Sequence, residues 1–218
     1  MLAFLDRVPA LGDCLLINGD LFDFWFAYRR AIPRRGFRIA SQLGVLARKL
    51  PIVMTGGNHD RWGDSFWDAE CGIRFSRDWI RFAIGSRVVE AHHGDGLVEE
   101  RWTARGLQRI TRHPLTSAVF RAMPADLGLW LVDRFSHHLS HHAEDTVGQE
   151  AAARSQQQWA EAKLAANPAL GLLVLGHTHR PVLTESSTGQ HYLNPGAWLD
   201  GLRYATATAD QVTLAQFS

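Results

Sequence analysis

Short apolar runs alternate with segments of helical periodicity along the N-terminal part of the chain. Residues 14–17 and 52–54 are apolar and β-favouring at consecutive positions, which is typical of strands covered on both faces. Residues 36–50 place apolar side chains three and four positions apart, which predicts an amphipathic helix, and residues 2–8 show the same spacing. Strands that alternate with helices favour a mostly parallel sheet, and therefore an α/β fold.

The pattern changes twice after this region. Residues 79–84 and 87–91 flank Gly85-Ser86, a two-residue turn signal that predicts a β-hairpin. Residues 97–167 then lose the strand pattern and become helical in character, so we expect a helical cap inserted between two core strands. Strand-like runs return toward the C-terminus, at residues 171–175, 182–185, 190–193, 203–208 and 211–217.

Composition limits the class of protein. The chain has 218 residues, 46% of them hydrophobic, so it can form one large domain with a filled core, and its net charge of +1 argues against a nucleic-acid-binding polycation. Only Cys14 and Cys71 are present, and Cys14 is expected in a buried strand, so a reducing compartment fits better than a disulfide framework. No apolar run approaches the ~20 residues of a membrane span and residues 1–11 do not resemble a signal peptide, which makes a cytoplasmic protein the default prediction.

Four of the predicted strands end in polar residues beside a glycine. These polar stretches are Gly19-Asp20, Gly57-Asn58-His59-Asp60, His93-Gly94-Asp95 and Gly176-His177-Thr178-His179. Glycine lets the backbone turn sharply where a side chain would clash, and open α/β sheets place their ligands just beyond the carboxyl ends of the strands. We therefore expect these side chains to meet at one edge of the sheet.

The residue types at this edge suit a pair of divalent metal ions. Asp20 offers a carboxylate that can bridge two ions, and Asn58 offers a neutral amide oxygen. The imidazoles of His93, His177 and His179 suit transition metals such as manganese, iron or zinc. Because such a pair clamps a phosphorus centre and lowers the pKa of bound water to about 7, the pattern predicts hydrolysis of a phosphoester.

Three other patterns each allow two interpretations. Residues 22–26 crowd the first loop with aromatic side chains, which either plug the space beside the sheet or form one wall of a substrate cleft. A row of arginines on one helix face is either a solvated surface or a basic lip for an anionic substrate or membrane. This row consists of Arg101, Arg105, Arg109 and Arg112. Residues 127–135, which include Trp130, form either the core of the cap itself or a site for acyl chains.

At these motifs the sequence resembles the calcineurin-like metallophosphoesterase superfamily, from Asp20 to Trp198. Within it, residues 19–25, 93–95 and 176–181 are similar to the UDP-2,3-diacylglucosamine pyrophosphatases of lipid A synthesis, as is the long helical insertion. The resemblance implies a single domain over residues 1–218 with a four-layer α-β-β-α sandwich and an inserted cap. It also implies hydrolysis of UDP-2,3-diacylglucosamine to UMP and 2,3-diacylglucosamine 1-phosphate.

The resemblance also implies a role for each site residue. Asp20 would bridge two divalent ions, expected to be Mn²⁺, with His179 on one of them. Asn58, His93 and His177 would bind the other ion. His59 would stabilise the transition state or protonate the leaving oxygen, or it would make a structural hydrogen bond.

Other residues are implied as support or as substrate contacts. Asp23, Asp60 and Asp95 would orient the metal ligands from behind. A second set would contact a UDP-linked acylated sugar, and peripheral contact with the inner face of the inner membrane would follow from that lipid substrate. This second set is Arg101, Arg105, Arg109 and Trp130.

The chain departs from the superfamily at its start. Members open with a strand that ends in Asp-x-His, whereas this chain has no such motif and begins at the next helix, in which Asp6 is no substitute. We therefore expect that Met1 is not the natural start or that the gene is truncated, and that a genuine short form would be impaired or inactive. Two alternatives stay open: a phosphoesterase acting on a nucleotide or phosphoprotein, and a non-catalytic binding protein that has lost the first metal site.

Overall fold

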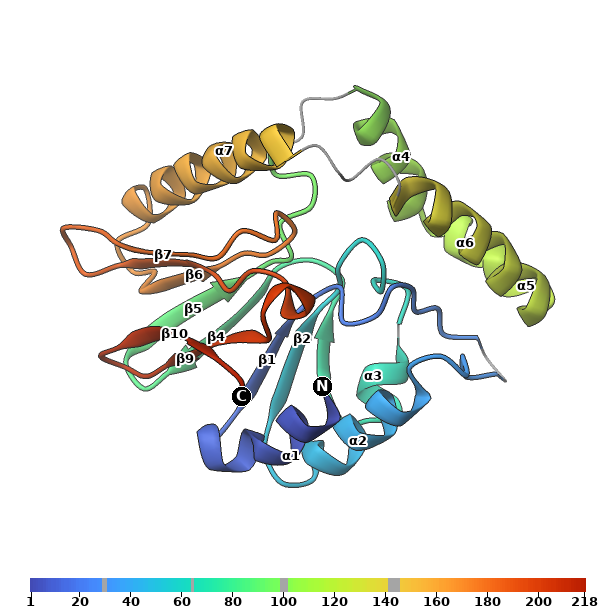
Figure 1. The fold of residues 1–218 in the computed structure, drawn as a ribbon, viewed down its shortest axis with the longest axis horizontal. Coiled ribbons are helices and arrows are strands. Elements are labelled where there is room, and N and C mark those ends of the chain that lie inside the picture. Colours follow the sequence, from blue (N-terminus) through green and yellow to red (C-terminus); the bar gives the residue numbers. More distant parts are fainter. Residues whose placement is uncertain (29–30, 64, 99–101, 141–145) are drawn as a thin grey trace.

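The computed structural model describes residues 1–28, 31–63, 65–98, 102–140 and 146–218, and its core consists of two β-sheets with helices on both outer sides (Figure 1). The helices are α1 (Leu2–Leu11), α2 (Phe37–Ala47), α3 (Ser65–Ala69), α4 (Trp102–Arg112), α5 (Pro114–Ala122), α6 (Ala125–Ser140), α7 (Thr146–Ala165) and the short 3₁₀-helix η1 (Trp198–Asp200). The strands are β1 (Leu15–Asn18), β2 (Ile52–Thr55), β3 (Arg74–Ser76), β4 (Ile80–Ile84), β5 (Arg87–Ala91), β6 (Leu172–Val174), β7 (Val182–Glu185), β8 (His191–Asn194), β9 (Arg203–Ala207) and β10 (Val212–Gln216).

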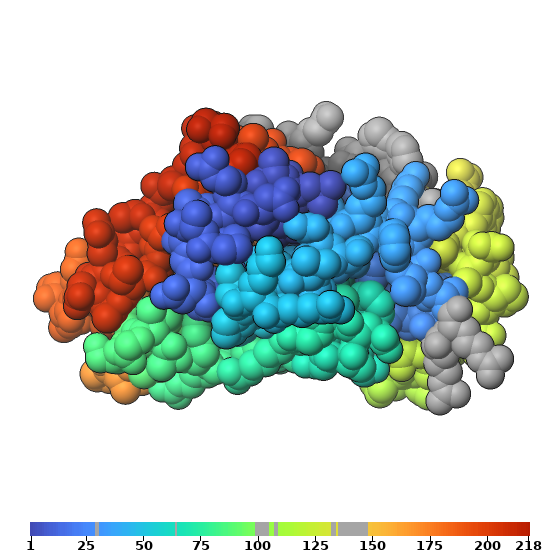
Figure 2. Space-filling model, turned by 90° about the horizontal axis from the view of Figure 1, so that it is seen from below, coloured from blue at the N-terminus to red at the C-terminus, as the bar shows by residue number. Residues whose placement is uncertain are grey.

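The first sheet holds β1, β2 and β3 in that order, all parallel. Side chains alternate between the two faces of a strand, and β2 uses both. Ile52 and Met54 pack with Leu5 of α1 and Leu43 of α2, whereas Val53 lies in the cluster between the two sheets. Because both faces of β2 are covered, all of its residues are buried. Figure 2 shows this helical layer from below, with the blue and cyan atoms of α1 and α2 across the middle of the face.

The second sheet has the order β4-β5-β6-β8-β7, with parallel β5, β6 and β8 flanked by antiparallel strands. Leu172 and Val174 of β6 face the inter-sheet cluster that contains Val53. Leu173 faces the other way and packs with Ala160 and the rest of the apolar stripe of α7. The layers are therefore helices, sheet, sheet and helix, and the predicted four-layer α-β-β-α arrangement is confirmed.

The C-terminal strands β9 and β10 form a separate antiparallel pair. A two-stranded sheet is marginal by itself, so its packing against other elements decides whether it forms. The ring of Phe4 on α1 lies 4.8, 5.2 and 5.6 Å from the rings of Trp198, Tyr204 and Phe217. This aromatic cluster fastens the C-terminal pair to the first helix.

Helices α4, α5 and α6 stand away from the sheets at one end of the molecule (Figure 1). These three helices are called the cap from here on, whereas α7 packs on the second sheet. The cap helices contact the loop that follows β2. There the Trp62 indole donates a hydrogen bond to the Thr111 carbonyl at the end of α4 over 3.0 Å. The ring of Trp62 also lies 5.2 Å from that of Phe120, and the Tyr28 hydroxyl donates to the Ala125 carbonyl over 3.4 Å. None of the helices in the described part of the chain is long and apolar enough to cross a membrane.

The predicted hairpin at Gly85-Ser86 is confirmed, with Ile84 paired to Arg87 across the turn. The prediction of a buried strand at Cys14 is wrong, because Cys14 is exposed and the residues of β1 are only half-buried. In the described residues β1 has a ladder partner on one side only, which leaves its other side less covered. Pro9 lies inside α1, which continues to Leu11, although proline commonly ends a helix.

We predict that Leu173→Ala will lower the free energy of unfolding by about 2–5 kcal/mol, since it empties a fully buried position between the second sheet and α7. Leu199→Ala, at a position that is 85% exposed, should change it by less than about 0.5 kcal/mol. Urea denaturation followed by circular dichroism measures both values. Equal losses in the two variants would contradict the assigned packing of α7 on the sheet.

Candidate metal centre

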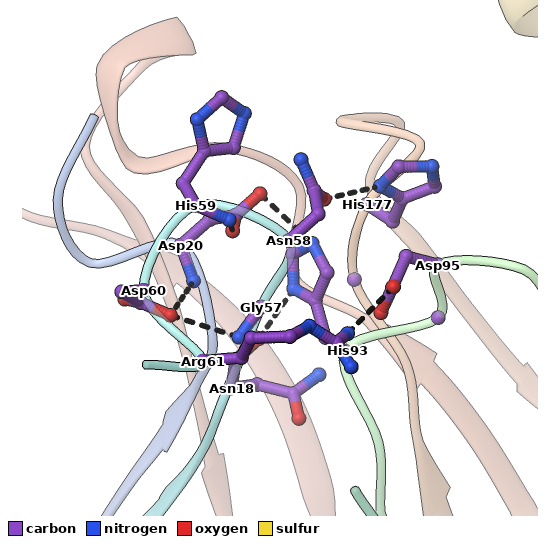
Figure 3. Close-up of polar contacts among 12 residues, drawn as sticks. Asn18, Asp20, Gly57, Asn58, His59, Asp60, Arg61, His93, Asp95 and His177 are labelled. Carbon is purple, nitrogen blue, oxygen red and sulfur yellow. Dashed lines mark hydrogen bonds and ion pairs between the residues drawn. The ribbon is translucent and has the colours of Figure 1, made fainter. Parts of the chain in front are cut away.

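The loops at the carboxyl ends of β1, β2, β5 and β6 meet where the ends of the two sheets come together (Figure 3). The first two strands belong to the first sheet and the other two to the second sheet. The loop after β1 supplies Asp20, the loop after β2 supplies Asn58, and the loops after β5 and β6 supply His93 and His177. The site is therefore assembled from both sheets rather than from one.

Asp20, His93 and His177 each place a ligand atom within 4.8 Å of the others. The Nδ1–H of His93 donates to the Asn18 carbonyl over 2.9 Å, which turns Nε2 of the same ring toward Asp20. Nε2 lies 2.9 Å from Asp20 Oδ2, and the contact does not have hydrogen-bond geometry although Nε2 is buried. A carboxylate and two imidazoles that converge in this way fit a divalent transition metal ion.

Two glycines make this convergence possible. A Cβ at Gly57 would clash with the Asp20 carboxylate. A Cβ at Gly19 would lie 2.7 Å from His93 Nδ1 and 2.8 Å from the Gly57 backbone, and Gly19 also has a φ of 77°. The glycines noticed in the sequence therefore let the first, second and third loops approach one another.

The backbone is strained at several site residues. Asp20, His177 and His179 have φ values of 50°, 69° and 58°, in the left-handed region that costs a non-glycine residue about 1–3 kcal/mol. Such strain persists only where the surroundings hold it, and it is often found at functional sites. This strain could not be predicted from residue types, because Asp and His are not confined to the left-handed region.

Asp60 holds the first two loops together. Its Oδ1 accepts hydrogen bonds from the Gly57 N–H over 2.8 Å and the Asp20 N–H over 3.2 Å, and its Oδ2 accepts from the Leu21 N–H over 2.7 Å. The Asp20 Oδ1 in turn accepts from the His59 N–H over 2.9 Å. Asp60 is fully buried, and burial together with the charge of Asp20 raises its pKa.

Charge at the site is set mainly by the pairing of Asp20 with His93. Burial would raise the pKa of Asp20, but the charge and contact of His93 hold it well below its usual range. Burial likewise opposes protonation of His93, but the Asp20 carboxylate raises the pKa of His93 to about 9. His177 retains exposed surface, but the surrounding loops partly remove water from its ring. This desolvation and the positive charge of His93 lower the pKa of His177 to about 4. His177 is therefore neutral at pH 7, as a metal ligand must be.

The remaining predicted residues lie around this cluster. Asn58 Oδ1 lies 3.1 Å from His177 Nδ1, so the amide reaches the same space. The His59 Nδ1 lies 2.7 Å from the carbonyl of Asp23, which acts through its backbone while its side chain is exposed. His179 is exposed and stands outside the three-residue cluster of ligand atoms.

Asp95 connects the third loop to the second loop and to the cap. Arg61 donates to Asp95 Oδ2 over 2.6 Å, and Arg112 donates to the same oxygen over 3.0 Å and to the Asp95 carbonyl over 2.9 Å. Burial would raise the pKa of Asp95, but the charges of Arg61, His93 and Arg112 lower it. Arg112, a member of the predicted arginine row, thus reaches the buried Asp95 from a partly exposed position and joins the cap to the site.

The predicted substrate contacts do not join the ligand cluster. Arg101 lies outside the described residues. Arg105 and Arg109 are exposed on α4, and Trp130 is exposed on α6. Sequence reasoning missed Arg61 and also missed the supporting residues Asp78, His92, Gln156 and Asn194. Of these, Gln156 carries a signal, because it falls on the apolar stripe of its helix.

His92 also supports the third loop. Its Nδ1 accepts the Gly94 N–H over 2.8 Å, so the proton on its other nitrogen points to Asp78 Oδ1, 2.7 Å away. The ring also stacks on Trp79, with centroids 4.6 Å apart. Its neighbour His93 is thus fixed by hydrogen bonds on both sides of the turn.

We predict that Asp95→Asn will lower the free energy of unfolding at pH 7 by about 3 kcal/mol, because it leaves the buried Arg61 guanidinium without a charged partner. The folded-state pKa of Asp95 lies below its unfolded value of about 3.9, so its stabilisation is complete above that pH. The difference from the wild-type protein should shrink as the pH falls through the folded-state pKa. Unfolding measured from pH 3 to 7 tests this, with exposed Asp210→Asn as control, and a difference that does not vary with pH would refute the assignment.

The geometry agrees with comparisons to known proteins. The chain matches the family described as calcineurin-like phosphoesterase over residues 2–181. It is 25% identical over 219 residues to the UDP-2,3-diacylglucosamine hydrolase of Porphyromonas gingivalis, covering 93% of this chain and 83% of that protein. The enzyme of the same name from Yersinia enterocolitica is 24% identical over 224 residues, covering 99% of this chain and 90% of that protein.

Several solved structures match this chain at a distance. A single mutant of Vps29 from Entamoeba histolytica aligns over 99% of this chain and 89% of that one, with 15% identity and a TM-score of 0.39. That likeness is too weak to support an argument about this protein. The sequence match, in contrast, spans most of the chain and contains the loops that carry Asp20, Asn58, His93 and His177. The protein therefore belongs to the calcineurin-like phosphoesterase family.

Proposed function

We propose that this protein is a metal-dependent hydrolase that cleaves the pyrophosphate of UDP-2,3-diacylglucosamine. Water adds across one P–O bond, and the products are UMP and 2,3-diacylglucosamine 1-phosphate. The observation that carries the proposal is the convergence of Asp20, His93 and His177 ligand atoms within 4.8 Å of one another. The substrate is supported by the curated relatives, which bear the name of that hydrolase.

We infer that two divalent ions, with Mn²⁺ as the expected metal, are held by the chain's own residues. Asn58, His93 and His177 would hold one ion, His179 the other, and Asp20 both. When bound, such ions offset the negative charge of a pyrophosphate and make water a stronger acid. Asp60 serves this centre by holding the backbone from which the Asp20 carboxylate projects. The lack of side chains at Gly57 and Gly19 leaves room for that carboxylate and for the neighbouring loops.

His59 is suited to move a proton. Its Nδ1–H donates to the Asp23 carbonyl, which leaves Nε2 on the opposite side of a half-buried ring. In Figure 3 this ring points away from Asp20 and His93 into the open side of the site. There His59 would deliver a proton to the phosphate oxygen that leaves, with Asp23 fixing the tautomer.

The cap supplies surfaces that suit both ends of the proposed substrate. Leu115, Val119 and Trp130 are 67%, 60% and 59% exposed, which is unusual for large apolar side chains on neighbouring helices. Arg109 of α4 is exposed as well. Acyl chains would lie on the apolar side chains and phosphate near the arginine, and a lipid-linked substrate would bring the protein to the cytoplasmic face of the membrane.

We predict that the purified chain, supplied with Mn²⁺, will release UMP from UDP-2,3-diacylglucosamine at a low but measurable rate, in keeping with the expected impairment of a short form. Asp20→Asn should abolish the release, and His59→Ala should lower kcat by about 10²–10⁴-fold, the usual contribution of a general acid. Asp210→Asn, at an exposed position in the turn between β9 and β10, is the matched control and should leave the rate unchanged.

A generic aryl phosphodiester, assayed in parallel, separates the parts of this proposal. Hydrolysis of the diester alone, lost in Asp20→Asn, would retain a phosphoesterase centre and reject the lipid substrate. Release of UMP that survives Asp20→Asn would reject the assigned centre. No hydrolysis of either compound would reject catalysis by this chain.

We predict that Arg109→Ala and Trp130→Ala will raise KM for the acylated substrate about tenfold, which corresponds to the loss of one contact of about 1.4 kcal/mol. Their kcat for the aryl diester should not change, since neither residue lies in the ligand cluster. Arg154→Gln, on the exposed side of α7, is the control for loss of surface charge. Equal effects on both compounds would remove these residues from the substrate site.

A further inference from the structure

Gln156 is a buried polar residue on an otherwise apolar helix face. The buried residues of α7 include Ala153, Gln156, Ala160 and Leu164, which recur three and four positions apart and face the second sheet. Gln156 has no exposed surface. Burying an amide is costly unless its hydrogen bonds are satisfied, so the partners of Gln156 indicate why it is there.

The hydrogen bonds around Gln156 fix the orientation of its amide. Asn194 Oδ1 accepts the Gly196 N–H over 2.9 Å, so the other atom of that amide, Nδ2, is a donor. It donates to Gln156 Oε1 over 3.2 Å, and the Tyr192 hydroxyl donates to the same oxygen over 3.0 Å. Gln156 Oε1 is therefore the acceptor, and its Nε2 is free to donate in the other direction.

That direction leads to the two loops that carry histidine ligands. Gln156 Nε2 donates to the Gly176 carbonyl over 3.2 Å, next to His177. The same nitrogen would lie 2.6 Å from a Cβ at Gly94, so it is in close contact with the turn that follows His93. Gly176 N–H in turn donates to the His93 carbonyl over 2.7 Å. One amide thus contacts both turns at the point where their backbones join.

The loop after β6 needs such support because its backbone is strained. His177 and His179 both have positive φ, and between them the Thr178 N–H donates to the Gly176 carbonyl over 2.8 Å. The Gly176 carbonyl also accepts from Asn194 Nδ2 over 3.1 Å, and Asn194 Nδ2 reaches Thr178 Oγ1 over 3.0 Å. Gln156 and Asn194 therefore both donate to the Gly176 carbonyl, which also closes this turn through the Thr178 N–H.

We propose that Gln156 is a positioning residue that sets the relative placement of His93 and His177 and thereby the metal affinity of the centre. This inference rests on the proposed metal-binding function of those histidines. It assigns to α7, through which the chain returns from the cap, a direct part in the metal site. The position calls for a side chain that accepts two hydrogen bonds on one side and donates on the other, as an amide does.

The test uses Gln156→Glu in the whole chain at a pH where the glutamate is ionised, because ionised glutamate has nearly the same shape but no donor for the Gly176 carbonyl. Mn²⁺ alone is the probe, titrated by electron paramagnetic resonance. The expected result is an affinity about 10–100-fold weaker than that of the wild-type protein, the usual effect of removing a group that orients a metal ligand. Tyr192→Phe, which removes one donor to Gln156 and keeps the packing, should give a smaller loss in the same direction.

Two controls separate positioning from loss of stability. Gln158→Glu makes the same chemical change at an exposed position two residues along α7 and should bind Mn²⁺ like the wild-type protein. Leu43→Ala should destabilise the first-sheet side of the molecule, far from Gln156, without weakening Mn²⁺ binding to the folded protein. Circular dichroism establishes that each variant is folded.

The outcomes are distinct. Wild-type affinity in a folded Gln156→Glu variant would overturn the inference. If that variant does not fold, unchanged affinity in Tyr192→Phe overturns it instead, and weakened affinity supports it. Failure of the wild-type protein to bind Mn²⁺ would overturn the proposed metal centre itself, and this inference with it.

Discussion

Asp20 Oδ2 and His93 Nε2 lie 2.9 Å apart although they come from different sheets, and much of the structure serves to keep them there. An anionic and an imidazole ligand atom must be brought together out of water, with no side chain between them. Gly19 and Gly57 give the loops room, and the apolar cluster between the sheets sets the separation of the strands. Rigid packing of that cluster matters because a metal ligand displaced by even a fraction of an ångström is a poorer ligand.

Three of the four loops of the centre are fixed by a buried polar side chain that comes from elsewhere in the chain. Asp60 of the second loop holds the first loop, Arg61 holds Asp95 of the third, and Asn194 of β8 holds the fourth. These groups have their hydrogen bonds largely satisfied within the protein, and a network of this kind gives a single geometry rather than a set of alternatives. The strain at Asp20 and His177 is maintained by this network.

The local pattern of the sequence was enough to predict most of the strands, the hairpin at Gly85-Ser86 and the glycine-flanked loops, because each is set by residues close together in the chain. It missed the short strand β3. It was enough to nominate Asp20, His93 and His177, which the structure brings together. It could not show that Arg112 contacts the buried Asp95, since its spacing matches that of the other arginines in the row. It also placed Cys14 in a buried strand, because apolar runs do not reveal how many neighbours a strand will have.

Helix α7 belongs to two parts of the molecule at once. Its residues from Ala153 to Leu164 form the outer layer of the second sheet and touch the metal loops, whereas its N-terminal turn follows the segment that leads from the cap (Figure 1). The boundary between the cap and the sheet layers therefore runs through the interior of a helix. A chimera that takes its cap from a relative would have to join the two sequences before Ala153. Such a chimera could change its substrate preference. The residues of α7 from Ala153 onward, and with them the metal site, would keep their positions on the second sheet.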